Sequence, residues 1–209
     1  MQNARNRFWT ATIATLGIWL AALLLGGADA GADEGLRGAL YAPGGTGLSS
    51  FAGMITRLGD GVVLGVIAVA AAIYLFFTRR IRAALLLITV FAGRLLVELQ
   101  KMLVGRDRPG VSEHLEAVSS MSFPSSHAAN SMITFIAIAL LVPVGQRNRS
   151  LSIAAALVLT LLVGWSRVAL GVHWPSDVIG GWAFGLLWVA ICIRLASARG
   201  DAEASSGAR

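Results

Sequence analysis

Charged residues are scarce in this chain. Asp, Glu, Lys and Arg make up 13% of its 209 residues, whereas hydrophobic residues make up 56%. A soluble domain carries roughly 25% charged residues, and the mean hydropathy of this chain is +0.72. This composition excludes an ordinary soluble domain and indicates an integral membrane protein.

Lysine and cysteine are nearly absent. Lys101 is the only lysine, so arginine supplies almost all of the positive charge behind the formal net charge of +6. The basic residues stand mostly at the ends of apolar runs, as is typical around membrane spans. No basic stripe with interleaved aromatics appears, which argues against nucleic-acid binding. The single cysteine, Cys192, cannot form an intramolecular disulfide, and its place in an apolar run indicates a packed thiol.

Long apolar runs divide the chain. A helix needs about 20 apolar residues to cross the ~30 Å hydrocarbon core, and six stretches meet or approach this length. We therefore predict an all-α integral membrane bundle of six transmembrane helices, over residues 8–27, 61–77, 81–102, 126–144, 151–172 and 178–195. Two connections are long, namely 28–59, where an interfacial helix is expected near 48–58, and 103–124.

The distribution of arginine predicts the orientation. Arginines gather before the first apolar run, between the second and third, between the fourth and fifth, and at the end of the sixth. By the positive-inside rule both termini are cytoplasmic, and the polar motifs face the periplasm or exterior of the inner (plasma) membrane. Residues 1–196 are expected to form one domain, followed by a disordered cytoplasmic tail over the small and polar residues 197–209.

The first apolar run leaves one alternative open. Arg5 and Arg7, the run itself and the sequence Ala28-Asp29-Ala30 also resemble a signal peptide with its cleavage site. The run, of about 20 residues, is long for an h-region of 7–15, which favours a retained helix. Cleavage would not change the orientation of the remaining spans.

Three polar motifs interrupt the apolar sequence. K-x6-R-P begins at Lys101, P-S-S-H at Pro124 and S-R-x5-H-x3-D at Ser166. Together they place three cations, two histidines and one carboxylate in or beside apolar stretches, where an unpaired charge is costly. These residue types suit phosphoryl transfer, which needs cations for a phosphate, a nucleophile held by a carboxylate and a separate proton donor.

The third motif ends in a histidine and a carboxylate. His173 and Asp177 are four residues apart, a spacing that places two side chains on one face of a helix. A carboxylate that binds one ring nitrogen leaves the other free to attack phosphorus. Pro175 suits the first turn of a helix, so the pair should lie near a helix start. The plainer interpretation of His173 is an interfacial histidine bonded to a loop carbonyl.

The second motif also predicts a helix start, at Pro124. Free backbone N–H groups there, together with the hydroxyls of Ser125 and Ser126, would form a phosphate cradle, and His127 would point at the bound group. The alternative is an ordinary run of N-cap serines, of which Ser122 is another candidate, beside a histidine that is hydrogen-bonded elsewhere.

The three motif cations are Lys101, Arg108 and Arg167. They would neutralise phosphoryl oxygens as charge develops, against the alternative that cations at span ends snorkel to the surface. Metal binding is poorly supported, because the candidate ligands are two histidines and one aspartate with three cations beside them. We therefore expect neither a metal nor another cofactor.

The remaining polar residues near the motifs are given lesser roles. Arg94 and Glu98 are four apart and are expected to form an ion pair inside the bundle. His114 is expected to be solvated. Arg106 and Asp107 are considered for a contact with the substrate head group.

Together the motifs resemble the signature of the type 2 phosphatidic-acid phosphatase superfamily, K-x6-R-P, P-S-G-H and S-R-x5-H-x3-D, over residues 101–177. Ser126 stands where that family usually has glycine. The resemblance implies metal-free chemistry in a six-span protein, with His173 as the nucleophile that forms a phosphohistidine, Asp177 as the residue that orients it and His127 as the general acid. It also implies that the phosphate is bound by Lys101, Arg108, Ser125, Ser126 and Arg167.

We accordingly expect a metal-independent phosphatase, a hydrolase of phosphoric ester or diphosphate bonds in lipids. Undecaprenyl pyrophosphate, phosphatidylglycerophosphate, phosphatidic acid and lipid A phosphates are substrates within the family, and an outward-facing site slightly favours the first. A lipid phosphotransferase and a non-enzymatic lipid-phosphate transporter stay open as alternatives. Vanadium-dependent haloperoxidases share the pocket but are soluble. The expected partners are the lipid phosphate and membrane lipids, without nucleic acid.

Overall fold

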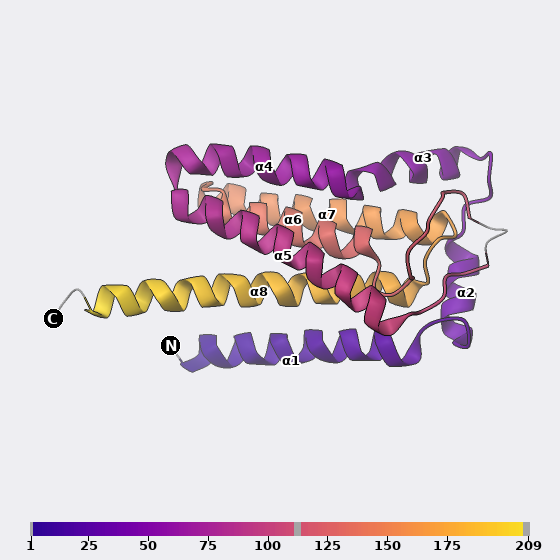
Figure 1. The fold of residues 1–209 in the computed structure, drawn as a ribbon, viewed down its shortest axis with the longest axis horizontal. Coiled ribbons are helices and arrows are strands. Elements are labelled where there is room, and N and C mark those ends of the chain that lie inside the picture. Colours follow the sequence, from indigo (N-terminus) through magenta and orange to yellow (C-terminus); the bar gives the residue numbers. More distant parts are fainter. Residues whose placement is uncertain (1, 111–113, 207–209) are drawn as a thin grey trace.

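The computed structural model describes residues 2–110 and 114–206, and the regular structure of this part is helical throughout. Figure 1 shows the long helices running side by side along the longest axis of the molecule. The prediction of an all-α protein is confirmed. In chain order the elements are α1 (Gln2–Leu25), α2 (Gly31–Leu40), α3 (Gly47–Thr56), the 3₁₀ helix η1 (Arg57–Gly59), α4 (Gly61–Thr78), α5 (Arg80–Val104), α6 (Ser126–Leu141), α7 (Gln146–Ala169) and α8 (Pro175–Ser206).

Local sequence sets several helix ends. Asp60 caps α4, because its Oδ1 accepts hydrogen bonds from the N–H groups of Val62 at 2.7 Å and Val63 at 3.4 Å. α5 ends at Gly105, whose φ of 62° lies in the left-handed region that glycine adopts without steric cost. α8 begins at Pro175, which fits the first helical turn because an N–H there has no intrahelical partner.

α6 is the central helix of the bundle. It packs against α4, α5, α7 and α8, and most of its residues are buried. α1 packs against α8. In Figure 1 both chain termini lie at one end of the bundle, while α2 and the connections that carry the motifs lie at the other. The up-and-down course of the long helices therefore brings all three motifs to the same end.

α6 and α8 approach each other closely along small residues. Gly181 and Gly185 of α8 face α6, where a Cβ added at Gly181 would lie 2.8 Å from the carbonyl oxygen of Ser125. At Gly185 an added Cβ would lie 2.8 Å from the Cβ of Met132. Small residues at this spacing let the backbones of membrane helices come together. The contact holds the start of α6 against the start of α8.

In the part of the chain that the structure describes, five helices are long and apolar enough to cross a membrane, namely α1, α4, α5, α7 and α8. α6 is also apolar but has only 16 residues, or about 24 Å at 1.5 Å per residue. It ends at Leu141 rather than at 144 as predicted, because Pro143 disfavours helical backbone in the residue before it. The structure thus has five membrane-capable helices around a shorter buried one.

Outside the spans the structure is more helical than the sequence led us to expect. α2 was not predicted, and the helix expected near 48–58 is present as α3 and η1, which pack against α7. The tail expected to be disordered from residue 197 continues as part of α8 to Ser206, since Ala, Arg and Glu favour helix continuation. Residues 207–209 lie outside the described part.

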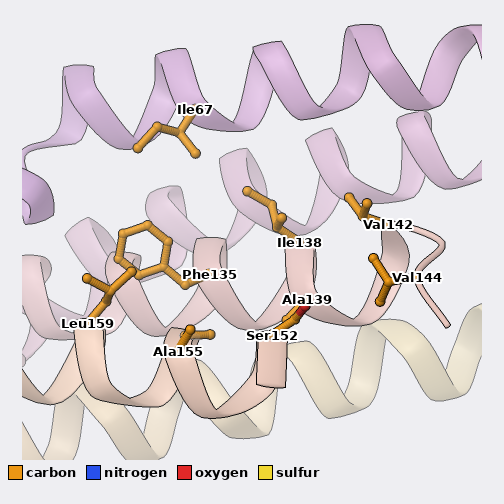
Figure 2. A pocket seen from close by; sticks show the side chains of 10 residues that line it. Ile67, Phe135, Ile138, Ala139, Val142, Val144, Ser152, Ala155 and Leu159 are labelled. Atoms are coloured by element: carbon orange, nitrogen blue, oxygen red, sulfur yellow. The ribbon is translucent and has the colours of Figure 1, made fainter. Parts of the chain in front are cut away.

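An apolar groove of about 240 Å³ lies between α4, α6 and α7, in the half of the bundle remote from the motifs. Figure 2 shows side chains such as Ile67, Phe135 and Leu159 around it. Apart from Ser152, its described lining residues are apolar. Such a lining lacks groups for phosphoryl transfer.

Gly185→Ala is expected to lower the thermal stability of the protein in detergent. The added methyl group would overlap α6, and overpacking of this kind costs about 1–3 kcal/mol. The matched control is Gly65→Ala in α4, where an added Cβ meets nothing within 4 Å. There the higher helix propensity of alanine should leave the melting temperature unchanged or raise it. Equal melting temperatures for the two variants would contradict the close α6–α8 contact.

Candidate active site

The three motifs meet where the ends of α5 and α7 lie near the beginnings of α6 and α8. Loop 105–125 joins α5 to α6, and several backbone hydrogen bonds fix its described residues. The N–H of Ser122 donates to the carbonyl of Arg106 at 2.8 Å, and the N–H of Ser125 donates to the carbonyl of Asp177 at 3.0 Å. The second bond ties P-S-S-H directly to the end of S-R-x5-H-x3-D.

Asp177 is fully buried and hydrogen-bonded on both carboxylate oxygens. Its Oδ2 accepts from the hydroxyl of Ser122 at 2.5 Å and from the N–H of Trp174 at 3.0 Å, and lies 3.3 Å from Nδ1 of His173. Its Oδ1 accepts from Nη1 of Arg106 at 2.9 Å. A buried carboxylate stays ionised only when it is paired and bonded in this way. The predicted His173–Asp177 contact is therefore present and reinforced by three further donors.

The two ring nitrogens of His173 face different partners. Nε2 lies 3.0 Å from Nη1 of Arg108. A guanidinium can only donate, so we assign Nε2 as the acceptor and place the ring proton on Nδ1, toward Asp177. Burial lowers the pKa of His173 well below its usual value, and the cations of Arg108, Lys101 and Arg167 lower it further. His173 is thus a neutral imidazole with its lone pair toward a cation.

Arg108 is held mainly by backbone carbonyl groups. Its Nε donates to the carbonyl of Ser120 at 2.7 Å, Nη1 to that of Val172 at 2.6 Å, and Nη2 to that of Met121 at 3.3 Å. Burial, and next repulsion from Arg167, lower the pKa of Arg108 to about 10. The side chain therefore remains a cation at neutral pH.

Lys101 points into the protein. The residue is 2% exposed, and its Nζ donates to the carbonyl of Met121 at 2.5 Å and to that of Ser122 at 3.5 Å. Snorkelling, the alternative for this lysine, does not fit a side chain buried in this way. Lys101 and Arg108 both bond the carbonyl of Met121, so these two motif cations lie close together.

Arg167 is equally buried, at 2% exposed. Its Nη1 donates to the hydroxyl of Thr56 at 2.7 Å and pairs with the carboxylate of Glu116. Its Nε is buried and has no hydrogen-bond partner among the described residues. Because an unsatisfied buried donor is costly, Arg167 has the capacity to bind a further acceptor.

The P-S-S-H motif begins α6 as predicted. Ser125 is the N-cap, and its hydroxyl accepts from the N–H of Ala128 at 3.5 Å. The hydroxyl of Ser126 donates instead to Oε1 of Glu98 on α5, at 3.0 Å. The side chain that replaces the usual glycine therefore bonds a carboxylate of α5, and none of its hydrogen bonds in the described part of the chain is to one of the three cations.

His127 lies in the first turn of α6 and packs against Gly59, where an added Cβ would lie 2.9 Å from the Cδ2 of the ring. Electrostatic repulsion from His127 is the smallest of the causes that lower the pKa of His173. Within the described part of the chain no hydrogen bond fixes this ring. The alternative of a histidine that is hydrogen-bonded elsewhere is not supported.

The predicted ion pair between Arg94 and Glu98 is wrong for the described residues. Nη1 of Arg94 donates to the carbonyl of Gly61 at 2.9 Å, and Glu98 accepts from Ser126. Each side chain finds a partner on a neighbouring element in place of its neighbour one turn away. His114, expected to be solvated, is partly buried, with Nε2 3.0 Å from the carbonyl of Pro109.

Several residues of the site could not be found from the sequence. Thr56 and Glu116 carry no signal in their spacing, and Ser122 was considered only as a helix cap. The head-group contact considered for Arg106 does not fit, because this guanidinium faces the interior and binds Asp177. The one available signal for Arg106 was its place two residues before the motif arginine.

A model of the PAP2 superfamily matches residues 82–201, which is more than half of the chain. The matched stretch contains all three motifs. The chain belongs to the PAP2 superfamily. The predicted family is therefore confirmed, and α1, α2, α3 and α4 lie before the matched stretch.

Relatives and solved structures agree with this assignment. Phosphatidylglycerophosphatase B of Bacillus subtilis is 37% identical over 138 residues, which cover 64% of this chain and 68% of that protein. A lipid A 1-phosphatase of Rhizobium johnstonii is 37% identical over 138 residues, 60% of this chain and 48% of that protein. The crystal structure of a transmembrane PAP2 type phosphatidylglycerolphosphate phosphatase from Bacillus subtilis has a TM-score of 0.81 and 29% identity, covering 89% of this chain and 96% of that one.

These PAP2 relatives are named as phosphatases of lipids, and the predicted enzyme class, a hydrolase of phosphoric ester or diphosphate bonds in lipids, is confirmed. Within residues 2–110 and 114–206, no group of three or more His, Cys, Asp and Glu side chains is arranged to hold a metal ion. The identity of the lipid and the roles of the individual residues belong to the proposal below.

Ser126→Gly is expected to change kcat/KM for a lipid phosphate by less than about tenfold, the equivalent of ~1.4 kcal/mol. The reason is that the hydroxyl bonds the exposed carboxylate of Glu98 and not the cation cluster. Glu98→Gln is the matched control, because it weakens the same bond from the other side. A hundredfold loss in Ser126→Gly but not in Glu98→Gln would place the hydroxyl on the phosphate and contradict this assignment.

Proposed function

We propose that this chain is a metal-independent membrane phosphatase that hydrolyses a lipid phosphomonoester or pyrophosphate through a phosphohistidine at His173. One observation carries the proposal: Nε2 of His173 accepts from Arg108 at 3.0 Å while Nδ1 faces the buried Asp177. A neutral imidazole fixed in one tautomer beside a cation is arranged to attack an electrophile that bears negative oxygens.

In the first step, Nε2 of His173 forms a bond to phosphorus as the bond from phosphorus to the leaving oxygen breaks. Asp177 stabilises the positive charge that develops on the imidazole, and His127 gives its proton to the leaving oxygen. In the second step, water attacks the phosphohistidine, the phosphorus–nitrogen bond breaks and His127 takes a proton from the water. Free phosphate leaves, and both histidines return to their starting states.

The phosphate would be bound by Lys101, Arg108 and Arg167, together with the free N–H groups at the start of α6. In the structure Glu116 pairs with Arg167. Carboxylate and phosphate oxygens are both anionic acceptors, so a bound phosphate would replace Glu116 on this guanidinium. The orphaned Nε of Arg167 would then gain a partner as well.

The substrate we propose is a lipid, because the catalytic residues lie at one end of a bundle of apolar helices. The phosphatidylglycerophosphatase and lipid A phosphatase relatives act, by their names, on lipid phosphomonoesters. An outward-facing site would also have access to undecaprenyl pyrophosphate. We keep these with phosphatidic acid as the substrate set to be tested.

We further propose six membrane crossings, with α6 as the sixth span inside the bundle, cytoplasmic termini and a site that faces the periplasm or exterior. Termini at one end of the bundle support an even number of crossings (Figure 1). Retention of α1 is supported by Arg106, which donates to the carbonyls of Ala22 and Leu23 near the end of that helix.

A topology reporter tests this arrangement. A reporter fused after Arg149 should be cytoplasmic, because the connection there is rich in arginine. One inserted after Gly110 should be external, because this connection carries the motifs and lies at the opposite end of the bundle. Finding both reporters on the same side would contradict six crossings.

The function is tested by release of free phosphate from a panel of undecaprenyl pyrophosphate, phosphatidylglycerophosphate, phosphatidic acid and lipid A, using pure protein in detergent with EDTA. We expect activity on at least one lipid to persist in EDTA and to be inhibited by vanadate, which adopts the five-coordinate geometry of the transition state. His173→Ala is the matched control. Activity lost to EDTA and restored by Mg²⁺ or Zn²⁺ would overturn the metal-free mechanism, and transfer of phosphate to an acceptor without release would favour the phosphotransferase.

The activities of the His173→Ala and His127→Ala variants should depend differently on the leaving group of the substrate. His173→Ala should abolish turnover of every substrate, because no covalent intermediate can form. His127→Ala should slow an alkyl phosphate by roughly 10²–10⁴-fold, the value of general acid catalysis. It should slow p-nitrophenyl phosphate much less, because p-nitrophenolate leaves without a proton. Equal losses on the two substrates would show that His127 binds phosphate or packs the site and is not the acid.

A further inference from the structure

Arg106 is not one of the proposed phosphate ligands, yet its guanidinium donates hydrogen bonds to four acceptors. Its side chain is 10% exposed. Nη1 donates to Oδ1 of Asp177 at 2.9 Å and to the hydroxyl of Ser176 at 3.0 Å. Nη2 donates to the carbonyls of Ala22 at 3.0 Å and Leu23 at 2.6 Å. This guanidinium thus joins α1 to the first turn of α8.

A second buried carboxylate supports this contact from α2. Asp33 is 7% exposed, and its Oδ1 accepts from the N–H of Ser176 at 2.9 Å. The hydroxyl of Ser176 donates to Oδ2 of Asp33 and accepts from Arg106. The contacts therefore form a continuous series from Asp33 through Ser176 and Arg106 to Asp177. Asp33 lies before the stretch matched by the superfamily model.

We propose that Arg106 is a positioning residue that holds Asp177 for catalysis, with Asp33 as its anchor. Arg106 binds one carboxylate oxygen so that the other, Oδ2, is presented to His173, and its charge offsets the carboxylate so that His173 stays neutral. The inference rests on the proposed function, because it assumes that His173 is the nucleophile.

The charge of Arg106 matters because of what else faces His173. Asp177 is the anion beside the ring, whereas Arg108 in the loop, Lys101 on α5, Arg167 on α7 and His127 on α6 are cationic or can become so. Without Arg106 the carboxylate would be less compensated, and an anion near an imidazole stabilises its protonated form. A protonated His173 cannot attack phosphorus.

These charges determine the direction in which the pKa of His173 changes when Arg106 is replaced. Loss of the Arg106 charge raises the pKa of His173, so the acid limb of kcat/KM, which reports the free enzyme, moves to higher pH. Arg106 reaches no part of the proposed phosphate site, so its loss should lower kcat and leave KM nearly unchanged. If Arg106 were a head-group ligand, its loss should instead raise KM and leave kcat nearly unchanged.

The experiment measures kcat and KM between pH 3.5 and 8.5 for the full chain in detergent, with dioctanoyl phosphatidic acid as the substrate. Arg106→Gln is expected to move the acid limb upward by about 1 pH unit and to lower kcat by at least about tenfold. Arg106→Lys retains the charge but not the forked geometry of the guanidinium. The acid limb of its kcat/KM profile should therefore stay at the wild-type pH, while kcat falls. The substrate ionises identically for all variants, so a difference between limbs belongs to the protein.

Two further variants serve as reference points. Asp33→Asn removes the anchor and a negative charge, so kcat should fall without an upward shift of the limb. Arg57→Gln removes an exposed arginine of η1 and should match the wild type.

If Arg106→Gln does not fold, Ser176→Ala tests the same series of contacts, and it should lower kcat at constant KM. Wild-type kcat in Ser176→Ala, or a wild-type limb with a raised KM in Arg106→Gln, would overturn the inference.

His173→Ala, measured in parallel, separates this inference from the proposed function. Activity in His173→Ala would refute the nucleophile and with it the proposed mechanism. An inactive His173→Ala together with wild-type behaviour of Arg106→Gln would refute only the role of Arg106.

Discussion

A buried carboxylate is stable as an anion only if donors meet both of its oxygens, and the arrangement of this site depends on how Asp177 satisfies that need. Its donors come from the turn before α8, which includes His173, and from loop 105–125. These two segments are far apart in sequence. Satisfying one carboxylate therefore requires that both be folded together, which also brings the P-S-S-H helix start into place through the bond between Ser125 and Asp177.

The motif cations differ from Asp177 in the partners that orient them. Lys101 and Arg108 are oriented mainly by backbone carbonyls of loop 105–125. A carbonyl fixes a cation in place without cancelling its charge, so these two side chains keep their positive charge available for an incoming anion. Arg167 differs, because Glu116 already occupies it. Under the proposed function, binding of a phosphate there would exchange one anion for another, which would add to the selectivity of the site.

Much of this could be predicted from sequence, because apolar length and motif spacing are local properties. The all-helical bundle, the helix starts near Pro124 and at Pro175 and the contact between His173 and Asp177 follow from such patterns. The contacts that could not be predicted join distant segments. Nothing in the spacing of Asp33, Glu116 or Arg106 indicates that their side chains converge near Asp177 and Arg167, and the pairing of Arg94 with Glu98 failed because both found tertiary partners. The length of α6 was overestimated because a count of apolar residues does not register Pro143, which disfavours helical backbone in the residue before it.

The central claim is that His173 becomes covalently phosphorylated. The most direct measurement mixes the protein with a lipid carrying labelled phosphorus, stops the reaction within milliseconds under alkaline denaturing conditions, and locates the label by peptide mass spectrometry. Phosphoramidates survive alkali and hydrolyse in acid, so the account predicts an alkali-stable, acid-labile label on His173 that is absent from His173→Ala. A label on another residue, or turnover at full rate with no labelled protein at any time point, would contradict it.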